Sequence, residues 1–263
     1  MPFAESTPVP EASGAAWLTV AGKLVLVTMG DSGQAGAYGL VDPDTGATLE
    51  QGKLPLGSGA GDDLEGIAAR GGRLYAVTSA GWMRVWTRGA AGFELVDGPY
   101  ALGAAMHGKD LDGPGMVCDP THFNCGRNYE GLALSEDAPH GDACIGVILG
   151  KASGTLYCLT EDDGRLVAHQ DRAFHVGRPK ALADVALDDH GALWVGANGF
   201  GLNGVWRITD WHDLAHAKLE ELGAYGVGFS EGIAVRGDLL YRFSDLGGAP
   251  SLMAKFRCPA IQR

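Results

Sequence analysis

The sequence is short of positive charge, of long apolar runs and of cysteine. Its 20 lysines and arginines face 32 aspartates and glutamates, which gives a formal net charge of −12. This balance disfavours nucleic acid and anionic membranes as partners, because both select basic surfaces. No apolar run reaches the roughly 18 residues that a membrane-spanning helix needs. The first residues lack the basic start and the apolar stretch of a signal peptide, so we expect a cytoplasmic protein, with a secreted or periplasmic one left open.

Several enzyme and metal motifs are also missing. The five cysteines include no Cys-x-x-Cys pair and no Cys/His spacing of the kind that holds structural zinc. The glycine-rich segment 30–36 lacks the lysine and the helix of a phosphate-binding loop. The segment 228–232, Gly-Phe-Ser-Glu-Gly, precedes a strand-like run, whereas the nucleophile elbow of serine hydrolases precedes a helix. These absences disfavour nucleotide binding of the P-loop type and serine-hydrolase chemistry.

The cysteines fall into two kinds of segment. Cys118 and Cys125 lie in a stretch rich in glycine, proline and asparagine, where a small disulfide loop is geometrically easy. Cys144 and Cys158 fall in apolar, strand-like runs, and we expect them to be small core residues. An odd total of five argues against a fully paired framework.

What the sequence does contain is a repeat that covers most of its length. Five similar motifs each begin an apolar run, at intervals of roughly 50 to 65 residues, which is the period of a four-stranded propeller blade. A second strand-like run that stops near a glycine follows each of them. The motifs are Ser13-Gly14-Ala15-Ala16, Glu65-Gly66-Ile67-Ala68, Glu130-Gly131-Leu132-Ala133, Ala183-Asp184-Val185-Ala186 and Glu231-Gly232-Ile233-Ala234.

The repeat predicts a single all-β domain over residues 1–263, a five-bladed β-propeller with a six-bladed one as the alternative. The predicted blades are 13–64, 65–129, 130–182, 183–230 and 231–263. We expect residues 2–10 to close the ring by supplying the last strand of the fifth blade, which removes an open sheet edge. Residues 101–129 form an insertion expected to cover the channel face. The segment 211–222 alone has a helical pattern.

Equivalent places in a propeller converge on its axis, so the repeat predicts two rings of polar side chains on one face. Carboxylates crowded there repel one another, and a cation with oxygen ligands, Ca²⁺ above all, would neutralise them. In the alternative interpretation, the same carboxylates accept hydrogen bonds from the backbone of neighbouring blades and hold the ring together. The predicted metal ligands are Glu65, Glu130, Glu231, Asp184, Asp31, Asn198 and Asp245, and Ser13 and Ser79 complete the two rings.

Other residues near this face are candidates for catalysis and for binding an anionic substrate. Loop histidines and a lysine in the second ring could move a proton or balance charge: His107, His122, His175 and Lys151. Cationic and aromatic side chains beside the motifs could bind substrate: Arg127, Arg178, Lys180, Tyr129 and Phe229.

Three of the motifs carry a family resemblance. The phrases DDLEGIA (62–68), NYEGLAL (128–134) and FSEGIAV (229–235), the first of them with a following LYAVT-type strand, resemble the phytase-like and SdiA-regulated, esterase-like propellers. The resemblance implies a calcium-associated propeller that hydrolyses phosphoesters or carboxylesters, and it extends to Glu65, Glu130 and Glu231. Ser13 and Ala183 depart from it. Calcium-dependent lactonase propellers are similar in architecture, and Glu65, Glu130, Asn198 and Asp245 resemble their mixed metal ring.

The sequence therefore predicts a Ca²⁺-dependent hydrolase of a phosphoester, carboxylester or lactone that acts as a monomer on a small, anionic molecule. Two alternatives stay open. One is a propeller that binds a ligand or a protein without catalysis, around a structural ion. The other is a metal-free tailoring or cyclising enzyme that uses the channel carboxylates as acid and base.

Overall fold

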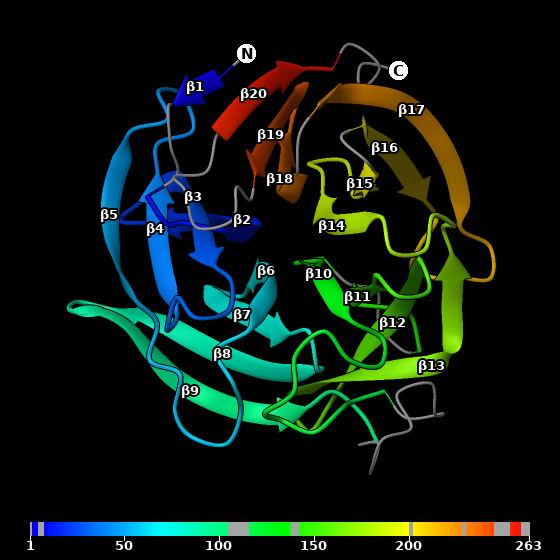
Figure 1. Cartoon of the computed structure of the whole chain (residues 1–263), viewed down its shortest axis with the longest axis horizontal. Coiled ribbons are helices and arrows are strands. Elements are labelled where there is room, and N and C mark those ends of the chain that lie inside the picture. Colours follow the sequence, from blue (N-terminus) through cyan, green and yellow to red (C-terminus); the bar gives the residue numbers. More distant parts are fainter. Residues whose placement is uncertain are drawn as a thin grey trace.

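Each repeat folds into a four-stranded antiparallel sheet, and five such sheets surround one axis in the computed structural model (Figure 1). The structure describes residues 2–4, 8–104, 116–137, 142–199, 202–227, 230–244 and 253–258. These residues contain no helix, and hence none that could span a membrane. The prediction of an all-β, five-bladed propeller is confirmed.

The strands follow one another outward from the axis in each blade. The first sheet comprises β2 (Ala12–Val20), β3 (Lys23–Gly30), β4 (Ala37–Val41) and β5 (Thr48–Lys53), and the second β6 (Leu64–Arg70), β7 (Arg73–Thr78), β8 (Trp82–Gly89) and β9 (Gly92–Ala101). The third comprises β10 (Tyr129–Leu134), β11 (Gly146–Gly150), β12 (Thr155–Asp162) and β13 (Arg165–His175), and the fourth β14 (Leu182–Leu187), β15 (Leu193–Gly199), β16 (Leu202–Thr209) and β17 (Lys218–Val227). The fifth comprises β18 (Ser230–Arg236), β19 (Leu239–Ser244), β20 (Met253–Arg257) and β1 (Pro2–Ala4).

The fifth blade closes the ring with both ends of the chain. Strand β1 pairs antiparallel with β20, Pro2 opposite Ala254 and Ala4 opposite Met253. The first and the last strand of the chain therefore lie side by side at the rim (Figure 1). Pairing the first strand with the last covers an edge that would otherwise offer free backbone groups. The expectation that the N-terminal segment closes the last blade is confirmed.

Apolar side chains pack between neighbouring blades. Five of the buried clusters among the described residues each join two adjacent sheets, as where Val77 of β7 and Ile148 of β11 belong to one cluster. The inner strands are buried almost throughout, whereas the outermost strand β13 alternates between half-buried and exposed side chains over much of its length. A strand enclosed on both faces needs continuous apolar residues, and a rim strand needs only one apolar face.

One sequence expectation about local structure is wrong, and one is incomplete. The segment 211–222 is no helix: turns follow Trp211, and the chain then enters β17, which pairs with β16. Buried Trp211 and Leu214 pack into the cluster between the third and fourth blades, which explains the apolar spacing. Cys144 and Cys158 are fully buried, but they form a disulfide with each other. Cys118 and Cys125 form the second disulfide, and Cys258 is free.

Candidate functional site

A β-bulge occurs at the same place in every inner strand, and it directs side chains toward one end of the axis. In β6 the pairing with β7 shifts between Leu64 and Gly66, so Glu65 is the extra residue. A bulge leaves its extra residue out of the ladder and changes the direction of that side chain. The extra residues of the five strands are Ser13, Glu65, Glu130, Ala183 and Glu231.

The residue after each bulge lets the inner strands approach closely. A Cβ atom at Gly66 would lie 2.7 Å from the backbone of Gly131, and one at Gly131 would lie 2.7 Å from the backbone nitrogen of Val185. Only glycine fits such contacts between backbones. In the fourth blade Asp184 takes the glycine place.

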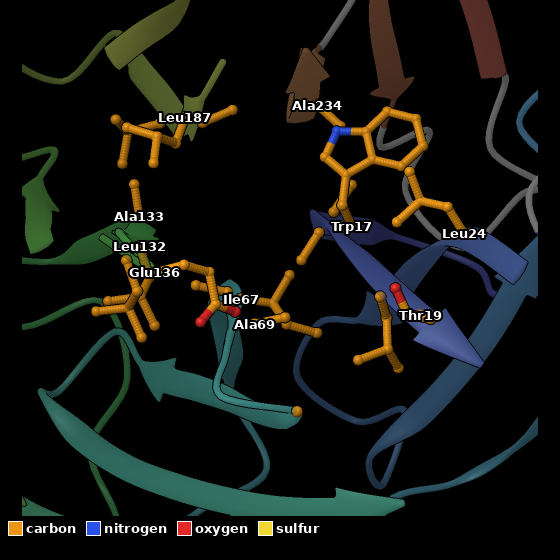
Figure 2. Close-up of a pocket in the computed structure, with 18 residues that line it drawn as sticks. Trp17, Thr19, Leu24, Ile67, Ala69, Leu132, Ala133, Glu136, Leu187 and Ala234 are labelled. Carbon is orange, nitrogen blue, oxygen red and sulfur yellow. The ribbon is translucent and has the colours of Figure 1, made fainter. Parts of the chain in front are cut away.

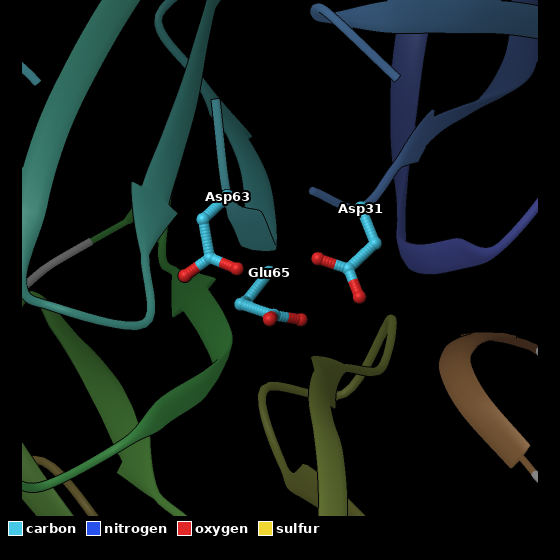
Figure 3. Close-up of side chains that lie close together, drawn as sticks. All are labelled: Asp31, Asp63 and Glu65. Atoms are coloured by element: carbon cyan, nitrogen blue, oxygen red, sulfur yellow. The ribbon is translucent and has the colours of Figure 1, made fainter. Parts of the chain in front are cut away.

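Asp31, Asp63 and Glu65 converge at this end of the axis, and we call them the acidic cluster (Figure 3). Their carboxylate oxygens offer one ligand atom each, all within 4.8 Å of one another. Asp31 follows β3, Asp63 precedes β6, and Glu65 is the bulge residue of β6. The Ser79 hydroxyl, at the end of β7, donates a hydrogen bond to Asp63 Oδ2.

Burial and mutual repulsion make the ionised form of the acidic cluster costly. Burial, with the charge of Asp63 as a further cause, raises the pKa of Asp31 to about 6. The pKa of Glu65 is raised well above its usual range, first by burial and then by the charges of Glu130 and Asp31. Burial likewise raises the pKa of Asp63. Such a cluster is stabilised by protons or by a bound cation.

Lys151 is the cation beside these carboxylates, and its ion pairs are with two other glutamates. Its Nζ lies 2.9 Å from Glu130 Oε2 and 3.9 Å from Glu231 Oε2. Asn128 Nδ2 donates to Glu130 Oε1 at 2.9 Å, and Asn198 Nδ2 donates to Glu231 Oε1 at 3.1 Å. The Oδ1 atoms of both asparagines are buried and have no hydrogen-bond partner among the described residues. Buried carbonyl oxygens of this kind usually accept a bond from water or a ligand.

The Glu130–Lys151 pair carries opposing electrostatic influences. Burial raises the pKa of Glu130 to about 8, although Lys151 acts in the opposite direction. Burial lowers the pKa of Lys151, but the charges of Glu130 and Glu231 outweigh this and raise it. A carboxyl group that gains and loses its proton near neutral pH therefore lies next to a charged amine.

Two ring residues hold neighbouring blades together, as the alternative interpretation of the two rings expects. The Ser13 hydroxyl donates to the backbone oxygen of Leu64 at 2.7 Å. Asp184 Oδ1 accepts the Val185 N–H at 2.7 Å, and its Oδ2 accepts the Ile233 N–H at 2.8 Å across the gap to the fifth blade. Both oxygens of Asp184 are thus engaged by backbone donors, which disfavours its predicted role as a metal ligand.

Several predicted residues have exposed side chains. His122 is exposed, with Nδ1 3.5 Å from Asp119, and His175 is exposed at the end of outermost strand β13. Exposed Arg178 lies over the Trp206 ring, and Lys180 is also exposed.

The aromatic candidate Tyr129 is a core residue. It is buried, and its hydroxyl donates to the backbone oxygen of Met116 at 2.8 Å, which disfavours its predicted contact with substrate. Arg127 lies over the ring of Tyr157. Predicted residues His107, Phe229 and Asp245 lie outside the described residues.

Asp63 and Asn128 belong to the site, although neither was among the predicted ligands. Asp63 precedes the Glu65 motif by two residues, and Asn128 precedes Glu130 by the same interval. An acidic or amide residue two places before a bulge glutamate is the signal that both share.

The opposite end of the axis is apolar (Figure 2). There, the second halves of the inner strands line a cavity of about 340 Å³, with Ala16, Ala68, Ala133, Ala186 and Ala234 from the five blades. Trp17 and Glu136 lie among the lining residues. The two ends of the axis therefore differ in chemistry, and the acidic cluster lies at the end opposite this cavity.

Comparisons with known proteins support the architecture. No protein-family model and no curated protein matches the sequence. The fold is similar to a Bacteroides uniformis protein proposed to be a 6-phosphogluconolactonase, with 14% identity, TM-score 0.50, and coverage of 97% of this chain and 87% of that one. It is also similar to the PQQ-bound aldose sugar dehydrogenase of Streptomyces coelicolor, with 16% identity, TM-score 0.50, and 95% of both chains covered.

A third similar structure is Myxococcus xanthus glutaminyl cyclase, with 16% identity, TM-score 0.50, and coverage of 97% of this chain and 95% of that one. At these identities the likeness shows the β-propeller fold alone. The phytase-like and SdiA-regulated resemblance has no family match and stays a prediction.

Proposed function

We propose that this propeller is a hydrolase that cleaves an ester bond in a phosphoester, carboxylester or lactone, with a divalent cation, Ca²⁺ first, at the acidic cluster. One observation carries the proposal. The carboxylate oxygens of Asp31, Asp63 and Glu65 lie within 4.8 Å of one another, while Lys151 forms ion pairs with Glu130 and Glu231.

The residues present fit a hard cation. Ca²⁺ takes six to eight oxygen ligands, from carboxylates, amide carbonyls and water. The acidic cluster offers three carboxylates, and Asn128 and Asn198, which donate to Glu130 and Glu231, have buried side-chain oxygens without partners among the described residues. Asp31, Asp63 and Glu65 would hold the ion, and a bound divalent cation supplies Lewis acidity and a more acidic water.

Glu130 is the proton-transfer group in this proposal. Hydrogen bonds from Asn128 and Lys151 fix its two oxygens, so its carboxyl group has one orientation. With a pKa of about 8, it accepts a proton from an attacking water and returns it to the leaving oxygen near neutral pH. Lys151 orients Glu130 and attracts an anionic substrate.

The proposal is tested by calcium titration of chelator-treated protein in a calorimeter, followed by assays on nitrophenyl esters, nitrophenyl phosphate and lactones. Wild type is expected to bind Ca²⁺ and to be active only with it. Asp63→Asn should lose most of the affinity. Glu130→Gln should bind the ion and lose activity by roughly 10²–10⁴-fold, because it removes an acid–base group. Absence of calcium binding would overturn the proposal.

A metal-free enzyme that cyclises its substrate is the second candidate. It is favoured by two carboxyl groups whose pKa values, about 6 for Asp31 and about 8 for Glu130, bracket neutral pH. Carboxyls with separated pKa values suit an acid–base pair. The similar fold of a glutaminyl cyclase is compatible with this candidate. Activity that persists in chelator, with a bell-shaped pH profile, would select it.

We keep a monomer acting on a small molecule as part of the proposal. Cytoplasmic location stays a prediction from the sequence. The two disulfides favour the secreted or periplasmic alternative, because disulfides form and persist in oxidising compartments.

A further inference from the structure

A small loop closed by the Cys118–Cys125 disulfide lies beside the acidic cluster, and we call residues 118–125 the disulfide loop. The end of β7 anchors it at both sides. The Cys118 N–H donates to the Ala80 oxygen at 2.9 Å, and the Tyr129 N–H donates to the Ser79 oxygen at 3.0 Å. The Trp82 indole donates to the Cys118 oxygen at 2.9 Å. The loop is therefore attached to the residues that follow the second strand of the second blade.

The disulfide loop contacts the surroundings of Asp63 from two directions. The Asn124 N–H donates to Ser79 Oγ at 2.8 Å, and Ser79 in turn donates to Asp63 Oδ2. The Gly61 N–H donates to the Pro120 oxygen at 2.9 Å, which fixes the backbone two residues before Asp63. Both the side chain of Asp63 and the segment that leads to it therefore depend on the disulfide loop.

The same loop leads directly into the Glu130–Lys151 pair. The Asn128 N–H donates to the Cys125 oxygen at 2.9 Å, while the Asn128 side chain donates to Glu130 Oε1. The Asn128 backbone oxygen accepts the Lys151 backbone N–H, also at 2.9 Å. Asn124 and Asn128 both have φ of 50°, a left-handed conformation that asparagine tolerates better than most residues. The turn geometry thus places Asn128 between the disulfide and the two charged groups.

We propose that the disulfide loop is the positioning element of the site: it holds Asp63, Glu130 and Lys151 in their relative places, and opening its disulfide weakens cation binding. This inference rests on the proposed function, because the cation site is the property that the loop is said to control. Residues that hydrogen-bond to metal ligands, and so orient them, typically weaken metal binding by roughly 10–100-fold when they are removed. The disulfide loop, Ser79 and Asn128 are positioning groups of this kind.

The chain contains a matched control for the test, because Cys144–Cys158 is a second disulfide that joins β12 to the segment before β11. Calcium affinity is measured by calorimetry for Cys118→Ser/Cys125→Ser and for Cys144→Ser/Cys158→Ser. The first pair should weaken binding by roughly 10–100-fold. The second should stay within about twofold of wild type, as for changes remote from a site. Equal effects of the two pairs, or none from the first, overturn the proposal.

Ser79→Ala supplies a test that keeps both disulfides, so it stays valid if the first pair fails to fold. It should weaken binding in the same direction. Combining it with Cys118→Ser/Cys125→Ser should add little, since changes that act through one contact are not additive. Fully additive effects would show that the loop does not act through Ser79.

A readout in calcium-free protein separates this inference from the proposed function. Carbon-detected NMR follows the carboxyl titrations of Asp63 and Glu130. These should shift in Cys118→Ser/Cys125→Ser and match wild type in the Cys144→Ser/Cys158→Ser control. If wild type binds no calcium but the titrations shift, the cation site fails and the positioning role stands. Unchanged titrations in the first pair overturn the positioning role.

Discussion

The environment of single carboxyl groups determines what this site can do. Asp31 is half-buried beside Asp63 and Glu65, and its ionisation places a third charge in a small volume. Asp184 is more deeply buried, but backbone N–H groups bind both of its oxygens. Those donors offset only part of the cost of burial, which raises the pKa of Asp184 well above its usual range, and the acidic cluster likewise relies on a proton or a cation.

The raised pKa of Asp31 predicts how the calcium-free protein responds to pH. Its pKa is about 6 in the folded state against 3.8 for an ordinary aspartate, so the folded protein binds the extra proton. The contribution of Asp31 to the free energy of unfolding is therefore fully present below about pH 4, and it is lost as the pH rises through about 6. The loss has an upper limit of about 3 kcal/mol, since one pKa unit corresponds to about 1.4 kcal/mol.

Asp31→Asn should remove this part of the pH dependence. Urea unfolding between pH 4 and pH 7 in chelator measures it, with exposed Asp213→Asn as the control for a carboxyl outside the cluster. A variant whose stability falls as steeply as that of wild type would contradict the prediction. Calcium should restore the stability of wild type at pH 7, because a bound cation replaces the proton.

At the scale of elements, the inner strands carry both the site and the closest contacts of the fold. The shared bulge directs Glu65, Glu130 and Glu231 toward the axis, and the glycine that follows lets the strands approach. The bulge orients the carboxylate, and the glycine beside it allows the close packing of the inner strands. A change at the glycine should affect the packing of the strands before it affects the chemistry of the carboxylates.

Gly66→Ala is expected to destabilise the protein by about 1–3 kcal/mol, the usual cost of inserting a group into a closely packed interior. The new Cβ would lie 2.7 Å from backbone atoms of Gly131 and Leu132, which have no side-chain freedom to yield. Gly61→Ala is the matched control: its Cβ would lie 3.7 Å from Pro120, an ordinary contact. Denaturant unfolding compares the two, and equal midpoints would contradict the role assigned to Gly66.

At the scale of the whole molecule, the repeat made the architecture predictable. Five motifs at blade spacing, each followed by a second strand, were enough for the number of blades and for the closing N-terminal strand. Local alternatives were harder to distinguish. The spacing of Trp211 and Leu214 suits a helix as well as a buried turn. The residues that follow form β17 because they pair with β16, a contact that the sequence does not reveal.

The site was predictable in part, for a physical reason. Repeat positions identify Glu65 and Glu130, because equivalent residues meet at the axis. Asp63 precedes β6, and a hydrogen bond from Ser79 holds its side chain in the site; that contact between two segments leaves no signal in the sequence. The pairing of Cys144 with Cys158 depends likewise on which strands become neighbours, so two apolar runs do not reveal it.

Closure of the ring is a property of the whole chain, and it can be tested at the seam. Removing residues 1–7 deletes β1 and exposes the edge of β20, with loss of the pairs at Ala254 and Met253. We expect a loss of about 1–3 kcal/mol, or roughly 2–10 °C in melting temperature for a chain of this size. An exposed edge also pairs with other chains. Size-exclusion chromatography with light scattering should therefore show association that increases with concentration in the truncated protein. If both melting temperature and size match those of the full chain, the ring is held by its inner strands alone, and β1 contributes no closure.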